Sequence, residues 1–222
     1  MLKQVASNLL RLKETGTEVY MATWGPKDAK SEQELIKYAS RVVDTLEYLV
    51  KQKGCTNIKY YCMIQEHSLN EWGSLIDEMP KFKNYHQKLF DEIKHRNLDI
   101  KLLATDASPI NRWWTIEWAT KNMDDITSVY GGHHYINSHS LDDERFYPWF
   151  LSKLQWGADM ARKKGNNFIL GEFGPKQDGR VVDGIKRDTC VYWDTPQEPL
   201  VGIQMAEAVI AAEERAGCGE DR

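Results

Sequence analysis

Apolar residues recur along the chain with two alternating periods. Short runs rich in β-branched and aromatic residues predict strands at 18–24, 58–65, 100–104, 128–135 and 167–171. Between them, apolar residues recur every three or four positions, which indicates amphipathic helices. These helices are expected at 5–14, 31–49, 82–96, 113–123, 144–164 and 199–216, with a break near Pro148 left open.

The order of these elements predicts an α/β fold. Each strand precedes a helix, and repeated βα units imply parallel strands joined by right-handed crossovers. This order fits an open doubly wound sheet as well as a closed barrel. Barrel enzymes collect their chemistry at the carboxyl ends of strands, and Trp24, Glu66, Asp106, Tyr135 and Glu172 all lie at predicted strand ends. We therefore expect a (β/α)8 TIM-barrel type of fold.

Composition narrows the function classes. The 222 residues suffice for one sizeable core, so we expect a single partial barrel domain over 1–222. The formal net charge of -4, with basic residues scattered among acidic ones, argues against a nucleic-acid partner. No apolar run is long enough to span a membrane. The N-terminus lacks a secretory-signal layout, so either the protein is cytosolic or Met1 is not the natural start of a secreted parent enzyme.

Two glutamates are the candidate catalytic pair. Strand alternation predicts that Glu66 shares a face with Ile64, and that Glu172 shares a face with Phe168 and Leu170. Two carboxylates about 5–5.5 Å apart at one barrel mouth can cleave a glycosidic bond, one attacking the anomeric carbon and the other protonating the leaving oxygen. A single strand-end glutamate is usually solvated or paired with lysine, but two of them amid Trp, His and Tyr favour a function.

The residues around these acids resemble a known family. Gln65-Glu66-His67 matches a motif that is usually Asn-Glu-Pro, His133-His134-Tyr135 matches His-x-Tyr, and Phe168–Gly174 is a close match to a third motif. The chain is similar to the clan A (β/α)8 retaining glycoside hydrolases, which are cellulase-like enzymes. The similarity extends from the first predicted helix to about Lys176, is expected to continue through the last helix, and corresponds to about strands three to seven of the barrel.

The resemblance implies a role for each matching residue. Glu66 would be the general acid/base and Glu172 the nucleophile. Gln65 would bind the sugar hydroxyl next to the reacting carbon, although the family has Asn there. His133 and Tyr135 would line the site, and the Tyr135 phenol would donate to the nucleophile. The implied partner is a β-linked oligo- or polysaccharide, and no cofactor or metal is expected.

Other residues are candidates on weaker signals. Trp24 and Trp72 lie beside predicted strand-end loops and could stack on sugar rings, whereas Trp114 and Trp118 have the spacing of a helix face that packs on the barrel. Asp106 either borders the site or caps the turn that follows it.

Relative to the family, strands one, two and eight are missing. We therefore expect a fragment that is weakly active or inactive by itself and that can self-associate through exposed strand edges.

Two alternatives stay open. One is a non-catalytic carbohydrate-binding relic of such a barrel, because Gln65 and His67 depart from the motif. The other is a metal-dependent hydrolase, since imidazoles and carboxylates suit zinc or manganese. Its candidate ligands are Glu66, His67, His133, His134, His139 and Glu172.

Overall fold

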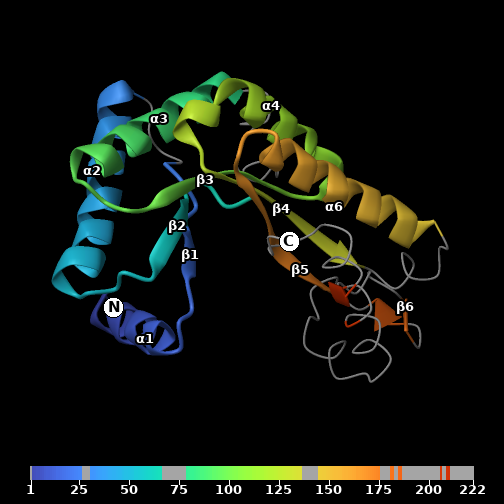
Figure 1. Ribbon diagram of the computed structural model, residues 1–222, viewed down its shortest axis with the longest axis horizontal. Coiled ribbons are helices and arrows are strands. Elements are labelled where there is room, and N and C mark those ends of the chain that lie inside the picture. The colour runs from blue at the N-terminus through green and yellow to red at the C-terminus, as the bar shows by residue number, and fades with distance from the viewer. Residues whose placement is uncertain are drawn as a thin grey trace.

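The chain forms a curved five-stranded parallel sheet with helices on its convex side (Figure 1). The computed structural model describes residues 2–26, 31–66, 79–136, 145–175, 181–182, 185–186, 206 and 209–210. The strands are β1 (Val19–Ala22), β2 (Ile58–Cys62), β3 (Lys101–Ala107), β4 (Val129–Ile136) and β5 (Asn167–Pro175). The main helices are α1 (Leu2–Glu14), α2 (Glu32–Glu47), α3 (Met79–His95), α4 (Trp114–Asn122) and α6 (Phe146–Arg162).

Short elements complete the described part of the chain. A π-helical turn, η1 (Tyr48–Gln52), extends α2, and η3 (Ile110–Arg112) and η4 (Asp124–Ile126) are 3-10 turns on either side of α4. Strands β6 (Val181–Val182) and β7 (Ile185–Lys186) pair in a separate antiparallel sheet. Trp72, His67, His139 and nearly all of the helix expected at 199–216 lie outside the described residues.

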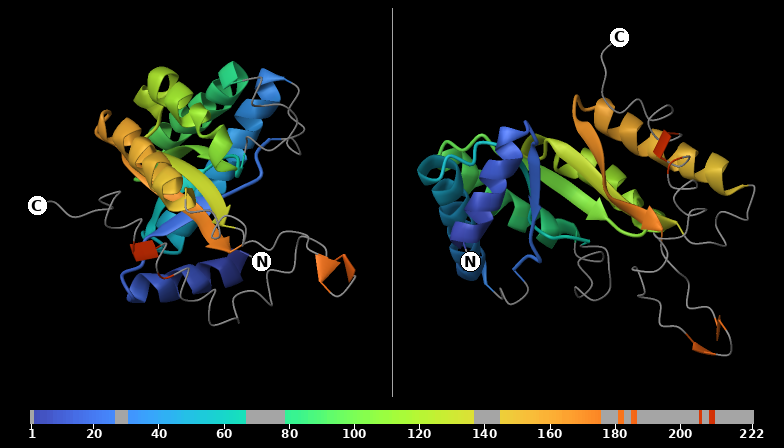
Figure 2. Two further views of the ribbon diagram at one scale, coloured as in Figure 1. Left: turned by 90° about the vertical axis from the view of Figure 1, so that its right-hand side faces the viewer. Right: turned by 90° about the horizontal axis from the view of Figure 1, so that it is seen from below.

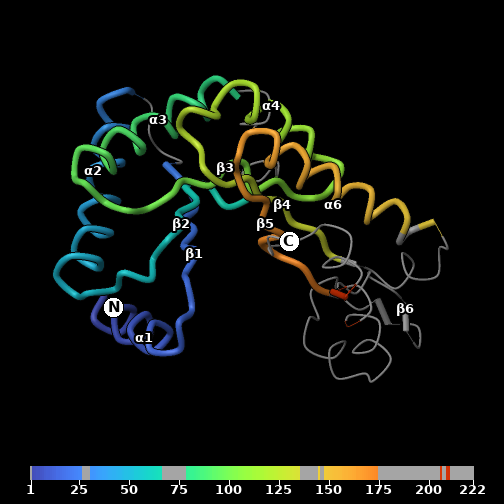
Figure 3. Tube along the Cα trace, in the orientation of Figure 1, coloured from blue at the N-terminus to red at the C-terminus, as the bar shows by residue number. Residues whose placement is uncertain are grey.

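Strand order decides between the two predicted architectures. The strands lie in chain order, β1-β2-β3-β4-β5, and every neighbouring pair is parallel. A doubly wound sheet reverses its order at a switch point, whereas a barrel adds each strand beside the last. The sheet curls as the strands accumulate, as the two views of Figure 2 and the trace in Figure 3 show. The fold is therefore an incomplete (β/α) barrel, which confirms the expected fold class.

Two apolar clusters mark the two faces of this sheet. The larger cluster joins the helices to the convex face of the strands. The smaller cluster contains strand residues alone and lies on the concave face, where the interior of a barrel would be. Its members are Cys62, Leu103 and Val129, with partly buried Tyr20, Ala22, Tyr60 and Ile169 packed against them.

The helix boundaries follow from local chemistry. Ser31 begins α2 with a capping box, in which its side chain accepts from the Glu34 N–H while the Glu34 carboxylate accepts from the Ser31 N–H. Helix α6 continues through Pro148 without a break, because Pro148 is its third residue and needs no intrahelical hydrogen-bond donor there. Among the described residues, no helix has both the length and the apolar character to cross a bilayer.

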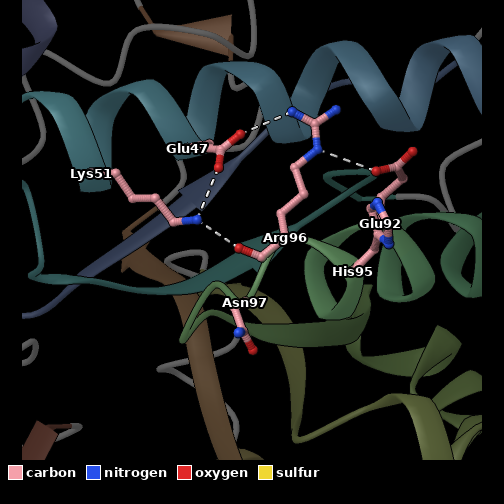
Figure 4. A pocket seen from close by; sticks show the side chains of 6 residues that line it. All are labelled: Glu47, Lys51, Glu92, His95, Arg96 and Asn97. Atoms are coloured by element: carbon pink, nitrogen blue, oxygen red, sulfur yellow. Dashed lines mark hydrogen bonds and ion pairs between the residues drawn. The ribbon is translucent and has the colours of Figure 1, made fainter.

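Arg96 links helices α2 and α3 at the amino-terminal end of the sheet. Arg96 follows α3, and its guanidinium contacts Glu47 at 3.0 Å and Glu92 at 3.3 Å (Figure 4). It also contacts Asp44 at 2.5 Å. Lys51 donates to the Arg96 carbonyl at 2.8 Å. A pocket lies beside these groups, but their charges are paired with one another. This end of a barrel serves stability.

The burial of the tryptophans near α4 differs from the expectation. Trp113, which precedes α4, is the buried one, whereas Trp114 is exposed and Trp118 is only partly buried. The Trp113 indole donates to the Ala107 carbonyl at 3.1 Å, and its ring lies against Gly132 of β4. The expectation that Trp114 packs on the barrel was wrong, because the short turn η3 rotates Trp113 into that position.

We predict that Gly132→Ala destabilises the fold by roughly 1–3 kcal/mol through overpacking. A Cβ at Gly132 would lie 2.6 Å from the Trp113 ring, which is buried and cannot move aside. Gly174→Ala is the matched control in a strand, since its Cβ would lie 3.9 Å from Tyr135, an ordinary contact. The free energy of unfolding in urea measures both; equal values for the two variants would contradict the packing described.

Candidate active site

Polar side chains from four strands meet at the carboxyl ends of the sheet. This is the end at which barrel enzymes carry out their chemistry. The cluster consists of Gln65 and Glu66 after β2, Asp106 of β3, His133 and Tyr135 of β4, and Glu172 of β5.

The two glutamates converge. One carboxylate oxygen of Glu66, one of Glu172 and one ring nitrogen of His133 all lie within 4.8 Å of one another. An inverting glycosidase needs about 6.5–9.5 Å between its carboxyl groups to admit a water, and a retaining one about 5–5.5 Å. The nearest oxygens of the two glutamates, no more than 4.8 Å apart, therefore lie closer to the shorter of these two separations.

Glu172 is held by donors on both carboxylate oxygens. The Tyr135 hydroxyl donates to Oε2, and the Gln65 side-chain amide donates to Oε1 at 2.5 Å. The Nδ1 atom of His133 is 3.6 Å from Oε2. These donors fix the orientation of the Glu172 carboxylate toward the site, and 30% of its side chain remains exposed.

Glu66 has a different environment. Its backbone is in the left-handed region, with φ of 48°, and its N–H donates to Asp106 Oδ2 at 3.1 Å. Its Oε1 accepts from His133 Nδ1 at 3.0 Å. That hydrogen bond lowers the pKa of Glu66 below its ordinary value, although burial opposes the shift. A general acid needs the opposite direction, so the resting site favours Glu66 as a base.

His133 is the buried centre of the cluster, with 1% of its side chain exposed. Its Nε2 lies 2.9 Å from Asp106 Oδ1, a close ion pair that lacks the geometry of a linear hydrogen bond. Burial alone would lower the pKa of His133, but Asp106 and Glu66 outweigh burial and raise this pKa to about 9. The imidazole is therefore a cation at neutral pH, with a carboxylate at each ring nitrogen.

Simple strand alternation misplaced the neighbours of Glu172. Phe168 packs on Trp113 and Leu170 belongs to the helix-side cluster, so both face away from the site. The pairing of β4 with β5 shifts between Gly132 and His133, which leaves Gly171 as an extra residue. This bulge turns Glu172 to the concave face. A Cβ at Gly171 would lie 3.0 Å from His133 Nε2, so a larger residue there would require the buried imidazole to shift by a few tenths of an ångström.

Alternation also failed between β2 and Glu66. Cys62 faces the concave side, but Ile64 belongs to the helix-side cluster and forms an isolated bridge with Trp24. Strand β2 ends at Cys62, so the following residues no longer alternate. Glu66 reaches the site through its left-handed turn, not by continuing the strand. On β4 the period of two did hold: His133 and Tyr135 share the site, and His134 packs on Phe150 of α6.

The sequence left the role of Asp106 open and did not indicate that Tyr20 belongs to the site. Asp106 is completely buried, borders the site and lies inside β3, which runs three residues beyond its expected end. It does not serve as the cap of the following turn that the sequence also allowed. The Tyr20 hydroxyl donates to Asp106 Oδ1 at 3.0 Å. Nothing in the sequence distinguishes Tyr20 from the aromatic residues of a barrel core.

Trp24 remains available for contact with a ligand, since it is 52% exposed. The residue before it, Thr23, is bonded to the segment that leads to the site: the Gln65 N–H donates to the Thr23 carbonyl at 2.8 Å, and the Thr23 hydroxyl donates to the Met63 carbonyl at 2.8 Å. Trp24 is thus held beside the segment that carries Gln65 and Glu66.

The residues at the site also bear on the metal alternative. Glu66, His133 and Glu172 offer ligand atoms close enough to share one divalent ion. A metal, however, binds neutral imidazole, and it would have to displace a proton whose pKa is about 9. At pH 7 this costs roughly 3 kcal/mol. His134, the other described histidine of this alternative, faces α6 instead of the cluster. The described residues therefore disfavour this reading.

The fold defines the class of protein as an incomplete (β/α) barrel, with its polar cluster at the carboxyl ends of the strands. A solved structure of a GH26 β-mannanase from Bacteroides ovatus is similar to this chain, with a TM-score of 0.54 and 16% sequence identity. The match covers 82% of this chain and 58% of that one, so this chain spans little more than half of the mannanase. No family model and no curated protein matches the sequence.

We predict that zinc does not stabilise the protein at pH 7, because His133 is protonated there. Thermal unfolding with zinc chloride and with a chelator should give the same midpoint. The proton penalty disappears as the pH rises through about 9, so any zinc effect that requires His133 should emerge only on the alkaline side. A higher midpoint at pH 7 that is lost in His133→Gln would restore the metal reading.

Proposed function

We propose that this chain carries the catalytic pair of a retaining glycoside hydrolase that acts on a β-linked oligo- or polysaccharide. Glu172 is the nucleophile and Glu66 the general acid/base. The observation that carries the proposal is the convergence of these two carboxylates in different surroundings, within the spacing of a double-displacement mechanism.

The surroundings of Glu172 suit a nucleophile. Donation from Tyr135 and Gln65 to its two carboxylate oxygens fixes its orientation toward the site. In the first step a Glu172 oxygen forms a bond to the anomeric carbon while the bond from that carbon to the leaving oxygen breaks. Protonated Glu66 gives its proton to the leaving oxygen, which completes a covalent glycosyl-enzyme.

The surroundings of Glu66 suit the second step best. The ionised Glu66 takes a proton from water, and the oxygen of that water attacks the anomeric carbon and releases Glu172. Since His133 lowers the pKa of Glu66, the protonated form needed for the first step is favoured at acidic pH. We therefore expect activity to be greatest on the acidic side of neutrality.

The charge of the site supports the same chemistry. The carboxylates of Glu66, Asp106 and Glu172 surround one imidazolium, so the cluster carries an excess of negative charge when they are ionised. Glycosidic cleavage passes through a transition state that resembles an oxocarbenium cation. Fixed negative groups aimed at that developing charge stabilise it.

The substrate class rests on the aromatic groups and on the fold. Trp24 presents an exposed flat face next to Gln65 and Glu66, and such faces can stack on the C–H faces of sugars. The similar structure belongs to a β-mannanase. A soluble β-mannan is therefore the first polymer to test, followed by a β-glucan and a xylan.

One observation favours a second candidate, a carbohydrate-binding relic. Glu66 in the resting site is biased toward the ionised form, which cannot protonate a leaving group. A chain that bound sugars through Trp24 without cleaving them would have no need of a protonated Glu66.

We predict that Glu66→Gln lowers turnover by roughly 10²–10⁴-fold, the contribution usual for acid–base catalysis, while ligand binding persists. Glu172→Gln should lower it at least as much, because no covalent intermediate can form. Glu117→Gln, which removes a solvent-exposed partner of Lys121 on α4, is the matched control and should retain activity. Release of reducing sugar measures turnover, and affinity electrophoresis in gels containing the polymer measures binding.

Azide separates the roles of the two acids. It needs no base to attack, so it should rescue Glu66→Ala on an activated aryl glycoside and give a glycosyl azide of retained configuration. Binding without turnover in the unaltered chain would favour the relic. Turnover that survives in Glu172→Gln would refute the assigned nucleophile.

A further inference from the structure

Asp106 contacts three other elements at once, although it is completely buried. Its Oδ1 accepts from the Tyr20 hydroxyl of β1 at 3.0 Å and lies 2.9 Å from His133 Nε2 of β4. Its Oδ2 accepts from the Glu66 N–H after β2 at 3.1 Å. A buried carboxylate is costly unless it is paired and hydrogen-bonded. These contacts satisfy Asp106 and link it to both the side chain and the backbone of the catalytic machinery.

The backbone supports a functional reading of this residue. Asp106 and Glu66 both have φ in the left-handed region, at 53° and 48°. Non-glycine residues adopt this conformation only at an energetic cost, and such residues gather at functional sites. The hydrogen bond from the Glu66 N–H to Asp106 joins the two strained residues directly. Asp106 thereby fixes the turn that delivers Glu66 to the site.

His133 transmits the charge of Asp106 to Glu66. The imidazole lies between the two carboxylates, with Nε2 toward Asp106 and Nδ1 toward Glu66. Gly171 lets the β5 backbone approach the ring closely, since even a Cβ there would lie 3.0 Å from Nε2. The protonation state of the ring determines whether Glu66 Oε1 contacts an imidazolium or a neutral imidazole.

We propose that Asp106 is a positioning residue for the acid/base: it holds His133 as an imidazolium against Glu66 and so sets the pH range over which Glu66 can act. This inference rests on the proposed function of Glu66. Asp106 itself touches neither the attacking oxygen nor, through any described contact, the leaving group.

The other groups near His133 must be included in the electrostatics. Tyr20 remains a neutral phenol because burial raises its pKa, and burial likewise keeps Cys62 a thiol. Among the residues that the structure describes, the charged and titratable groups facing His133 or its partners are Glu66 and Cys62 from the β2 segment, Asp106 from β3, Tyr135 on β4, Glu172 from β5 and Tyr20 from β1. The carboxylates in this described set are Glu66, Asp106 and Glu172, and of these three only Asp106 is completely buried and reaches Nε2.

The sign of the effect follows from these contacts. Removing the charge of Asp106 removes a group that stabilises the protonated imidazole, so the pKa of His133 should fall. A neutral His133 stabilises the Glu66 carboxylate less, so the pKa of Glu66 should rise. The protonated form of Glu66, which the first step requires, then persists to higher pH. The basic limb of the profile of kcat/KM against pH should therefore move upward in Asp106→Asn.

The decisive experiment needs no substrate. In protein with ¹⁵N-labelled histidine, NMR titration should find His133 protonated up to a pH of about 9, against an ordinary value of 6.5. Asp106→Asn should lower the titration midpoint by at least about one pH unit. Tyr20→Phe is the matched control: it removes a hydrogen bond to Asp106 without changing the charge, so it should not lower the midpoint.

Further variants keep the inference testable if Asp106→Asn does not fold. In Glu66→Gln, which alters a partly exposed side chain, the midpoint of His133 should stay above 6.5 because Asp106 remains. An ordinary midpoint in the unaltered protein, or an unchanged midpoint in Asp106→Asn, would overturn the inference. A shift without any glycosidase activity would instead uphold the Asp106–His133 coupling and refute the proposed function. With activity, an unmoved basic limb in Asp106→Asn would limit Asp106 to a structural role.

Discussion

The site depends on a single buried cation, the imidazolium of His133, held between the carboxylates of Asp106 and Glu66. Taking these groups out of water is unfavourable, and their mutual attraction offsets that cost together with the hydrogen bonds that Asp106 accepts. Each is supplied by a different part of the sheet, so the pairing also aligns the ends of β2, β3 and β4. Removing one partner would leave an uncompensated buried charge, which is why the three positions are coupled.

The two proposed catalytic acids differ because of this cation. Glu66 accepts directly from His133, whereas Glu172 is held mainly by the neutral donors Tyr135 and Gln65. The same carboxylic acid thus meets a charged donor at one position and uncharged donors at the other. Such asymmetry is how paired carboxylates acquire separate roles. Here the bias favours the base form of Glu66 in the resting site, which ties the proposed activity to acidic conditions.

Five strands suffice to assemble this cluster because its members come from adjacent strands. In a parallel sheet with strands in chain order, the carboxyl ends of β2 to β5 lie side by side. The likeness to a longer β-mannanase agrees with this reading of the fold. Self-association through the strand edges stays a prediction. So does the contribution of Trp72, which lies outside the described residues.

The sequence by itself determined the alternation of strands and helices and the positions of Gln65, Glu66, Tyr135 and Glu172 near strand ends. It could do so because apolar periodicity and the residues that end strands are local properties of the chain. Even there, the ends of β3 and β5 came out longer than expected, since pairing with a neighbour extends a strand beyond its apolar run.

Only the tertiary structure decided which side chains meet. The bulge at Gly171 reversed the face of Glu172, and a left-handed turn redirected Glu66 after β2 had ended. The contact between Gln65 and Glu172 joins residues 107 positions apart. Such contacts, like the burial of Asp106, depend on the register of neighbouring strands and on how their side chains pack. Those are properties of the packed sheet, and no run of consecutive residues encodes them.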